Sequence, residues 1–249
     1  MRISTYVDGS SAEQQGTERL QNSATDSLAR QAITGTIWFL LVLGLLIFLP
    51  AGSLRYWQGW LLWVNFTIWC AVYTLYFLRH DPALLARRLR AGPTAEREPT
   101  QKRIQLFASI FVCAIFVVSA LDDRMAWSSV PNAAVAIGNA TVAAGFFLIF
   151  LVLRENSFAS AIIEVGKGQR VIDTGPYAIL RHPMYAGALV LFGGVPLALG
   201  SWWGLFTLLP VAAIFAIRLI EEEKYLAHNL PGYTEYCSKV TDRLIPGVW

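Results

Sequence analysis

The stretch VIDTGPYAILRHPMYAG at residues 171–187 decides how the rest of the chain is organised. It holds a Gly-Pro turn, an Arg-His-Pro step and two tyrosines. No residue from Met184 to Ile217 is charged, and the acidic run Glu221-Glu222-Glu223 follows shortly afterwards. Because the apolar run between the two polar stretches is long enough to cross a bilayer, the polar residues are expected at the edge of a membrane.

The composition is that of a membrane protein. Of the 249 residues, 55% are hydrophobic and only 15% are charged, which lies outside the usual range of soluble domains. The sequence therefore predicts an all-α fold, a polytopic transmembrane helical bundle. The formal net charge of +3 is too small to indicate nucleic acid as a partner. Three cysteines without CxxC spacing predict neither a disulfide framework nor a metal site.

Six apolar runs predict about six spans, although five are also possible. The runs are Ile33–Leu49, Tyr56–Leu78, Ile104–Leu121, Asn132–Leu153 and two within Met184–Ile217, which turn at Gly200-Ser201-Trp202. Residues 1–32 are polar and predict a mobile cytosolic tail. The chain then divides into N-terminal spans at residues 33–149 and a C-terminal membrane region at residues 150–249.

The basic residues predict which side of the membrane each loop occupies. All of the 20 Lys and Arg except Arg55 and Arg124 fall in the first tail, in the loops at 79–103 and 154–182, or after position 217. Basic residues in short loops gather on the cytosolic side. Both termini are therefore expected in the cytosol, on the same side as the Arg-His-Pro step and the acidic run. With five spans one terminus would lie on the other side of the membrane, but the Arg-His-Pro step and the acidic run would still lie on the same side as each other.

The loop at 79–103 contains two further signals. Leu84, Leu85 and Leu89 share one face opposite Arg87, so this segment is either a short amphipathic helix on the membrane surface or simple loop. Gly92-Pro93-Thr94-Ala95-Glu96 is a turn and loop signal.

The segment Arg181-His182-Pro183 predicts a break in the backbone. Proline disfavours a helical conformation at His182 and has no N–H to donate. Such breaks at membrane depth are tolerated where the backbone lines a polar cavity or is covered by protein, which indicates a binding site. The alternative is that Arg181 and His182 only anchor a span at the interface.

The three consecutive glutamates cannot all face the bundle, because they spread over about 200° of a helix. Glu222 shares a face with Arg218 and can pair with it. Glu221 is expected to be solvated.

Together, TGPYAILRHPMYAG, the EExxL motif from Glu222 to Leu226, PGYTEYC and RLIPGVW resemble the isoprenylcysteine carboxyl methyltransferase family and its wider membrane methyltransferase superfamily, which includes the phospholipid N-methyltransferases. The resemblance covers about residues 150–249. It implies that S-adenosylmethionine binds at the cytosolic side of the membrane. The residues implied are His182, Tyr185, Glu222 and Glu223, with Arg181 and Tyr177 as neighbours.

The chemistry of S-adenosylmethionine agrees with these residue types. Its carboxylate suits Arg, His or free N–H groups, its ammonium and hydroxyl groups suit carboxylates, and its sulfonium suits aromatic faces. Methyl transfer needs no metal. The methyl acceptor is expected to be small or lipid-like, with a carboxylate, amine or thiol reached from the bilayer, and a bacterial inner membrane is the expected location. The resemblance covers neither catalytic nor acceptor-binding residues.

Two alternatives remain from the sequence. The ending YTEYCSKVTDRLIPGVW is also similar to the C-terminus of the sterol reductases, so an NADPH-dependent membrane reductase is one of them. A non-catalytic membrane protein that keeps the scaffold is the other. A soluble Rossmann methyltransferase is excluded, because the chain lacks a strand followed by GxGxxG and a helix.

Overall fold

The computed structural model describes residues 8–90, 96, 99–166 and 168–249, and these form helices joined by loops, with no strand among them. The predicted all-α class is confirmed. The elements are α1 (Asp8–Ala51), α2 (Trp57–His80), α3 (Pro82–Arg88), α4 (Pro99–Met125), α5 (Asn132–Glu155), η1 (Gly175–Ala178), α6 (Pro183–Ala198), η2 (Trp203–Thr207), α7 (Leu208–Asn229) and α8 (Tyr233–Lys239).

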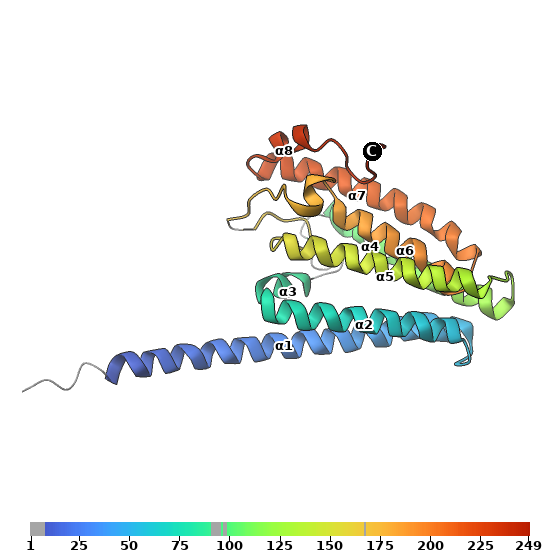
Figure 1. Cartoon of the computed structure of the whole chain (residues 1–249), viewed down its shortest axis with the longest axis horizontal. Helices are drawn as coiled ribbons and strands as arrows, with labels where there is room; N and C mark the ends of the chain where they lie inside the picture. Colours follow the sequence, from blue (N-terminus) through green and yellow to red (C-terminus); the bar gives the residue numbers. More distant parts are fainter. Residues whose placement is uncertain (1–7, 91–95, 97–98, 167) are drawn as a thin grey trace, which may run out of the picture.

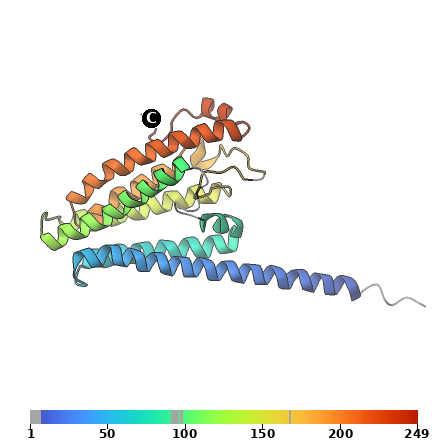
Figure 2. The same ribbon diagram turned by 180° about the vertical axis from the view of Figure 1, so that it is seen from behind.

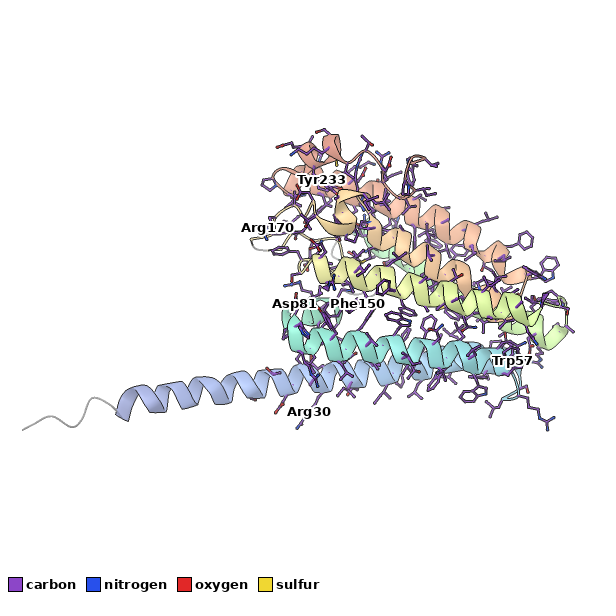
Figure 3. All side chains as sticks on the ribbon, in the orientation of Figure 1. Arg30, Trp57, Asp81, Phe150, Arg170 and Tyr233 are labelled. Atoms are coloured by element: carbon purple, nitrogen blue, oxygen red, sulfur yellow. The ribbon has the colours of Figure 1, made fainter. Side chains whose placement is uncertain are left out.

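The long helices lie side by side and alternate in direction (Figure 1). We call the end where α2, α5 and α7 finish the site end, and the end where α1 and α4 finish the far end. Helices α3 and α8 and the loop between α5 and α6 gather at the site end, whereas Trp57 lies at the far end (Figure 3). This arrangement brings residues 171–187 and the acidic run to one end of the bundle.

Five helical segments in the described part of the chain are long and apolar enough to span a membrane. They are Thr25–Ala51, Trp57–His80, Pro99–Met125, Asn132–Glu155 and Trp203–Asn229. The sixth apolar helix, α6, has 16 residues, which is about 24 Å against a hydrocarbon core of about 30 Å. The predicted runs therefore all form helices, and five of the six reach full spanning length.

Helix α1 begins earlier than the predicted first span. It is continuous from Asp8 to Ala51, so residues 8–32, expected as a mobile tail, are helical. The segment before Thr25 includes Gln, Glu, Ala, Arg and Leu, which are good helix formers, and has no proline, which permits helix independently of any membrane. The N-terminal part of α1 extends beyond the other helices (Figures 1 and 2).

The short region between α2 and α4 forms a helix at its start. Leu84–Leu89, predicted as surface helix or loop, lies in α3 and its C-cap, and Asp81 caps α3 by accepting from the Leu84 N–H at 2.9 Å. Of the turn and loop predicted at Gly92–Glu96, only Glu96 belongs to the described residues.

Helices α5 and α6 pack at unusually close range because glycines line their contact. A Cβ added at Gly145 would come within 2.4 Å of the Leu191 nitrogen. One added at Gly194 would lie 2.6 Å from the Gly138 carbonyl oxygen. Small residues let the backbones of membrane helices approach in this way. The motif before α6 is thereby held against the end of α5.

Helix α6 ends inside the bundle rather than at its edge, and side chains satisfy its last polar groups. Tyr56 donates its hydroxyl to the Leu199 carbonyl. Ser201 donates to the fully buried Asp122 carboxylate at 2.5 Å, and its hydroxyl oxygen accepts from the Gly204 N–H. Because irregular backbone inside a membrane needs internal partners, these bonds allow α6 to be short.

Candidate functional site

A cavity of about 640 Å³ opens at the site end. Its walls come from α4, α6, α7 and the loop at residues 156–172, and α3 and α8 each contribute to them. Arg170 of the loop and Tyr233 of α8 mark this region in Figure 3. A cavity of this size lies within the range of small-molecule and cofactor sites.

The Arg-His-Pro step forms the entry to α6. Pro183 is the first helical residue, and His182 before it has φ −124° and ψ 57°, outside the helical region. The freed backbone groups bond the C-terminal segment, because the Arg181 N–H donates to Asp242 O at 2.9 Å and the His182 N–H donates to Arg243 O at 3.0 Å. The predicted break is confirmed, and both side chains line the cavity.

Tyr185 connects α6 to two charged residues of α7. Its hydroxyl donates to Glu222 Oε2 at 2.7 Å and accepts from Arg218 Nε at 3.1 Å. Arg218 also donates to Glu96 at 2.6 Å and to Gln105 at 2.5 Å. The pair expected between Arg218 and Glu222 is thus bridged by Tyr185, and Arg218 forms its ion pair with Glu96 instead.

Glu223 lies behind the cavity wall and binds the residues that form it. Its carboxylate contacts Arg181 at 3.0 Å and Arg243 at 2.9 Å, and the His182 Nε2 lies 3.4 Å away without hydrogen-bond geometry. Arg181 further donates to the Val240 and Thr241 carbonyls at 2.6 and 2.8 Å. Each nitrogen of the Arg181 guanidinium therefore donates one hydrogen bond within the protein, and Arg181 and Glu223 together fix the wall in place.

Besides Tyr185, three tyrosines line the cavity. Tyr177 accepts from Asn156 at 3.0 Å, and burial raises the pKa of its phenol to about 12, so it is neutral at physiological pH. Tyr236 donates to the Tyr177 carbonyl at 2.7 Å, and burial also raises the pKa of Tyr233 and Tyr236. The sequence singled out Tyr177, whereas Tyr233 and Tyr236 entered only as part of the PGYTEYC match.

Other cavity residues come from the N-terminal half, where the sequence offered no motif. Gln105, Ala108, Ser109 and Val112 form one stripe of α4, and Arg88 reaches the cavity from α3. The spacing of the α4 residues is that of one helix face, which is the signal that could have indicated them. Arg88 carried no signal beyond the amphipathic pattern of its helix.

In the part of the chain that the structure describes, no group of His, Cys, Asp and Glu side chains could hold a metal ion. Two of the arginines at the site, Arg181 and Arg218, form ion pairs with glutamates, and much of the remaining wall is aromatic and apolar. The arrangement suits an organic ligand that has polar and apolar parts.

The bundle contains five described helices that are long and apolar enough to span a membrane, and its cavity at the site end is lined by both polar and apolar side chains. Residues 133–231 match the model of the phospholipid methyltransferase family. The matched region is therefore similar to proteins of the membrane methyltransferase superfamily, which also includes the isoprenylcysteine carboxyl methyltransferases. No curated protein matches the chain.

Proposed function

We propose that the protein is an integral-membrane methyltransferase that uses S-adenosylmethionine and acts on a small or lipid-like acceptor reached from the bilayer. One observation supports this most directly. The region that matches the phospholipid methyltransferase model contains both α6 and α7, and its RHPMY and Glu222 side chains line one cavity.

The residues of the cavity fit the three chemical features of this cofactor. Glu222 presents a carboxylate that suits the ammonium group or the ribose hydroxyls. Tyr177, Tyr185 and Tyr233 offer aromatic faces that suit a sulfonium cation. His182, which is buried at the wall beside them, suits the carboxylate of the cofactor. Glu223 and Arg181 would act indirectly, because they bind each other and the C-terminal segment and so fix the wall in position.

When bound, S-adenosylmethionine supplies an activated methyl group for in-line displacement by an oxygen, nitrogen or sulfur nucleophile. The protein then mainly has to align donor and acceptor and exclude water. The apolar side chains Val112, Ile149 and Phe215 line the same cavity, where they would help to align the reactants and to exclude water. We further propose that both termini and the cavity face the cytosol of a bacterial inner membrane, in line with the distribution of basic residues.

The proposal is tested by calorimetry on the purified protein in detergent. S-adenosylmethionine and S-adenosylhomocysteine are expected to bind at least about 10-fold more tightly than NADPH, which corresponds to ~1.4 kcal/mol or more. Adenosine, which lacks the amino-acid part, is the matched control and is expected to bind more weakly than either. Tighter binding of NADPH would favour a membrane reductase, the alternative that the resemblance of the C-terminus to the sterol reductases suggests.

A further inference from the structure

The arginines that line the cavity differ in whether a carboxylate neutralises them. Arg181 forms an ion pair with Glu223, and Arg218 forms one with Glu96. Among the described residues, no carboxylate lies within ion-pair distance of the guanidinium of Arg88, and the same holds for Arg170, which is exposed. Arg88 is half-buried and lines the cavity.

The contacts of Arg88 leave its charge uncompensated. Its Nη1 donates to the Ser160 carbonyl at 3.1 Å and lies 3.5 Å from the Met184 sulfur. Both partners are uncharged, and burial lowers the pKa of Arg88. A buried cation without a counter-ion is costly, and a guanidinium binds carboxylate and phosphate oxygens well. An anionic ligand would remove this cost.

Apolar side chains lie close to the helix that carries Arg88. Helix α3 packs on α2 and α1, and Met184 belongs to an apolar cluster built around Phe77, Leu84 and Leu153. In Figure 1, α3 lies between α2 and α5, whereas α7 lies beyond α5 and α6. The cavity continues along Ile149, Phe192 and Phe215. An anionic group at Arg88 would therefore adjoin space suited to an apolar chain.

Arg88 also lies outside the region shared with the phospholipid methyltransferase family, residues 133–231. In the proposed function, that shared region binds the methyl donor. Residues that select the acceptor are expected among the elements added to it, and α3 is one of them.

We propose that Arg88 binds the anionic group of an amphiphilic methyl acceptor, a phosphate or a carboxylate, whose apolar chain lies along Ile149 and Phe192. This inference rests on the proposed function, since it assigns the acceptor of the same cavity. It also predicts that the methyl donor is bound without Arg88.

The test compares Arg88→Gln with Arg90→Gln, which removes the same charge from an exposed position outside the cavity. The probes are decyl phosphate, decanoate and decanol, and their binding is measured by thermophoresis on protein held in amphipol. In the wild type, at least one anionic probe is expected to bind about 10-fold more tightly than decanol. Arg88→Gln is expected to abolish that preference, and Arg90→Gln to keep it. The better of the two anions identifies the group.

S-adenosylhomocysteine binding is measured on the same three proteins. This measurement distinguishes the two anions that Arg88 could bind, the anionic group of the acceptor and the carboxylate of the cofactor. Arg88→Gln is expected to leave the affinity for S-adenosylhomocysteine within about twofold of the wild type. A selective loss of S-adenosylhomocysteine binding would show that Arg88 holds the cofactor carboxylate, and it would overturn the inference while leaving the proposed function intact. Absence of S-adenosylhomocysteine binding in the wild type would instead contradict the proposed function.

Two measurements distinguish a lost anion contact from misfolding of the Arg88→Gln variant. Arg88→Lys keeps the charge and is expected to keep the preference for the anionic probe, with the melting temperature recorded for every variant. The wild-type comparison of decyl phosphate and decanoate with decanol needs no variant at all. Equal affinity for all three probes would overturn the inference.

Discussion

The three consecutive glutamates of α7 occupy three different environments. Glu221 forms an exposed ion pair with Lys224 at 2.6 Å, Glu222 accepts from Tyr185 in the cavity, and Glu223 binds Arg181 and Arg243 behind the wall. Each step along a helix turns the side chain by about 100°, so neighbouring residues of one type reach different partners. Only Glu222 of the three lines the main cavity.

This difference predicts the order in which variants lose cofactor binding. Glu222→Gln keeps the volume and removes the charge, and we expect it to weaken S-adenosylmethionine binding by ~1.5–3 kcal/mol, or about 10- to 150-fold. His182→Ala is expected to weaken binding to a similar extent. Glu221→Gln is the matched control and should change the affinity little. Dissociation constants are measured by calorimetry, and the melting temperature of each variant is recorded. Equal losses for Glu221→Gln and Glu222→Gln at unchanged stability would contradict the assignment.

At the scale of the elements, the contact between α5 and α6 fixes the site. Residues 181–185 form the start of α6, and α6 packs on α5 through glycines at positions 138, 145, 187 and 194. A larger side chain at this contact would separate the two helices and displace the wall of the cavity, since close-packed helices have no spare volume.

Adjacent glycines of α6 provide the test. A Cβ at Gly194 would meet the Gly138 carbonyl oxygen at 2.6 Å, whereas one at Gly193 would meet nothing within 4 Å. We expect Gly194→Ala to destabilise the fold by ~1–3 kcal/mol and to weaken cofactor binding. Gly193→Ala should leave stability unchanged or raise it slightly, because alanine favours helix. Thermal unfolding of both variants in the same detergent gives the comparison, and equal melting temperatures would show that the helices separate without cost.

At the scale of the whole molecule, the chain runs between the site end and the far end six times, with α6 as the short passage, in the part that the structure describes. The C-terminal segment returns to the site end, where Arg243 contacts Glu223. The loop between α4 and α5 lies at the far end. If the basic residues set the orientation, the site end faces the cytosol.

Cysteine labelling tests this orientation. In a background without Cys70, Cys113 and Cys237, a cysteine at Ser129 in the far-end loop should react with a membrane-impermeant maleimide from outside the cell. A cysteine at the exposed Ser238 of α8 should react only after the membrane is opened. Labelling of position 129 from the cytosolic face alone would defeat the proposed topology.

Much of this fold was predictable, because the constraints are local in sequence. A bilayer requires long apolar runs, and each predicted run became a helix. The prolines at positions 176 and 183 marked the turn and the start of α6. The convergence of His182, Tyr185 and Glu222 followed from the hairpin that joins α6 to α7.

The remaining contacts depend on tertiary packing that no local pattern records. Arg218 pairs with Glu96, which lies 122 positions earlier in the chain, rather than with Glu222 one turn away. Arg88 enters the cavity from a segment whose pattern indicated a helix on the membrane surface or simple loop. The early end of α6 depends on Asp122 and Tyr56, two residues that are distant from it in sequence.

Buried side chains fill the bundle between the cavity and the far end. Toward the far end, the positions that follow the cavity-lining residues on α4, α6 and α7 are Ile115, Val195 and Val211, all fully buried. The serines that bond Asp122 lie beyond them. Along α4, α6 and α7 the cavity is therefore closed toward the far end. In the proposed function, donor and acceptor are then taken up and released in the half of the membrane that holds the site end, and neither is carried across the bilayer along these helices.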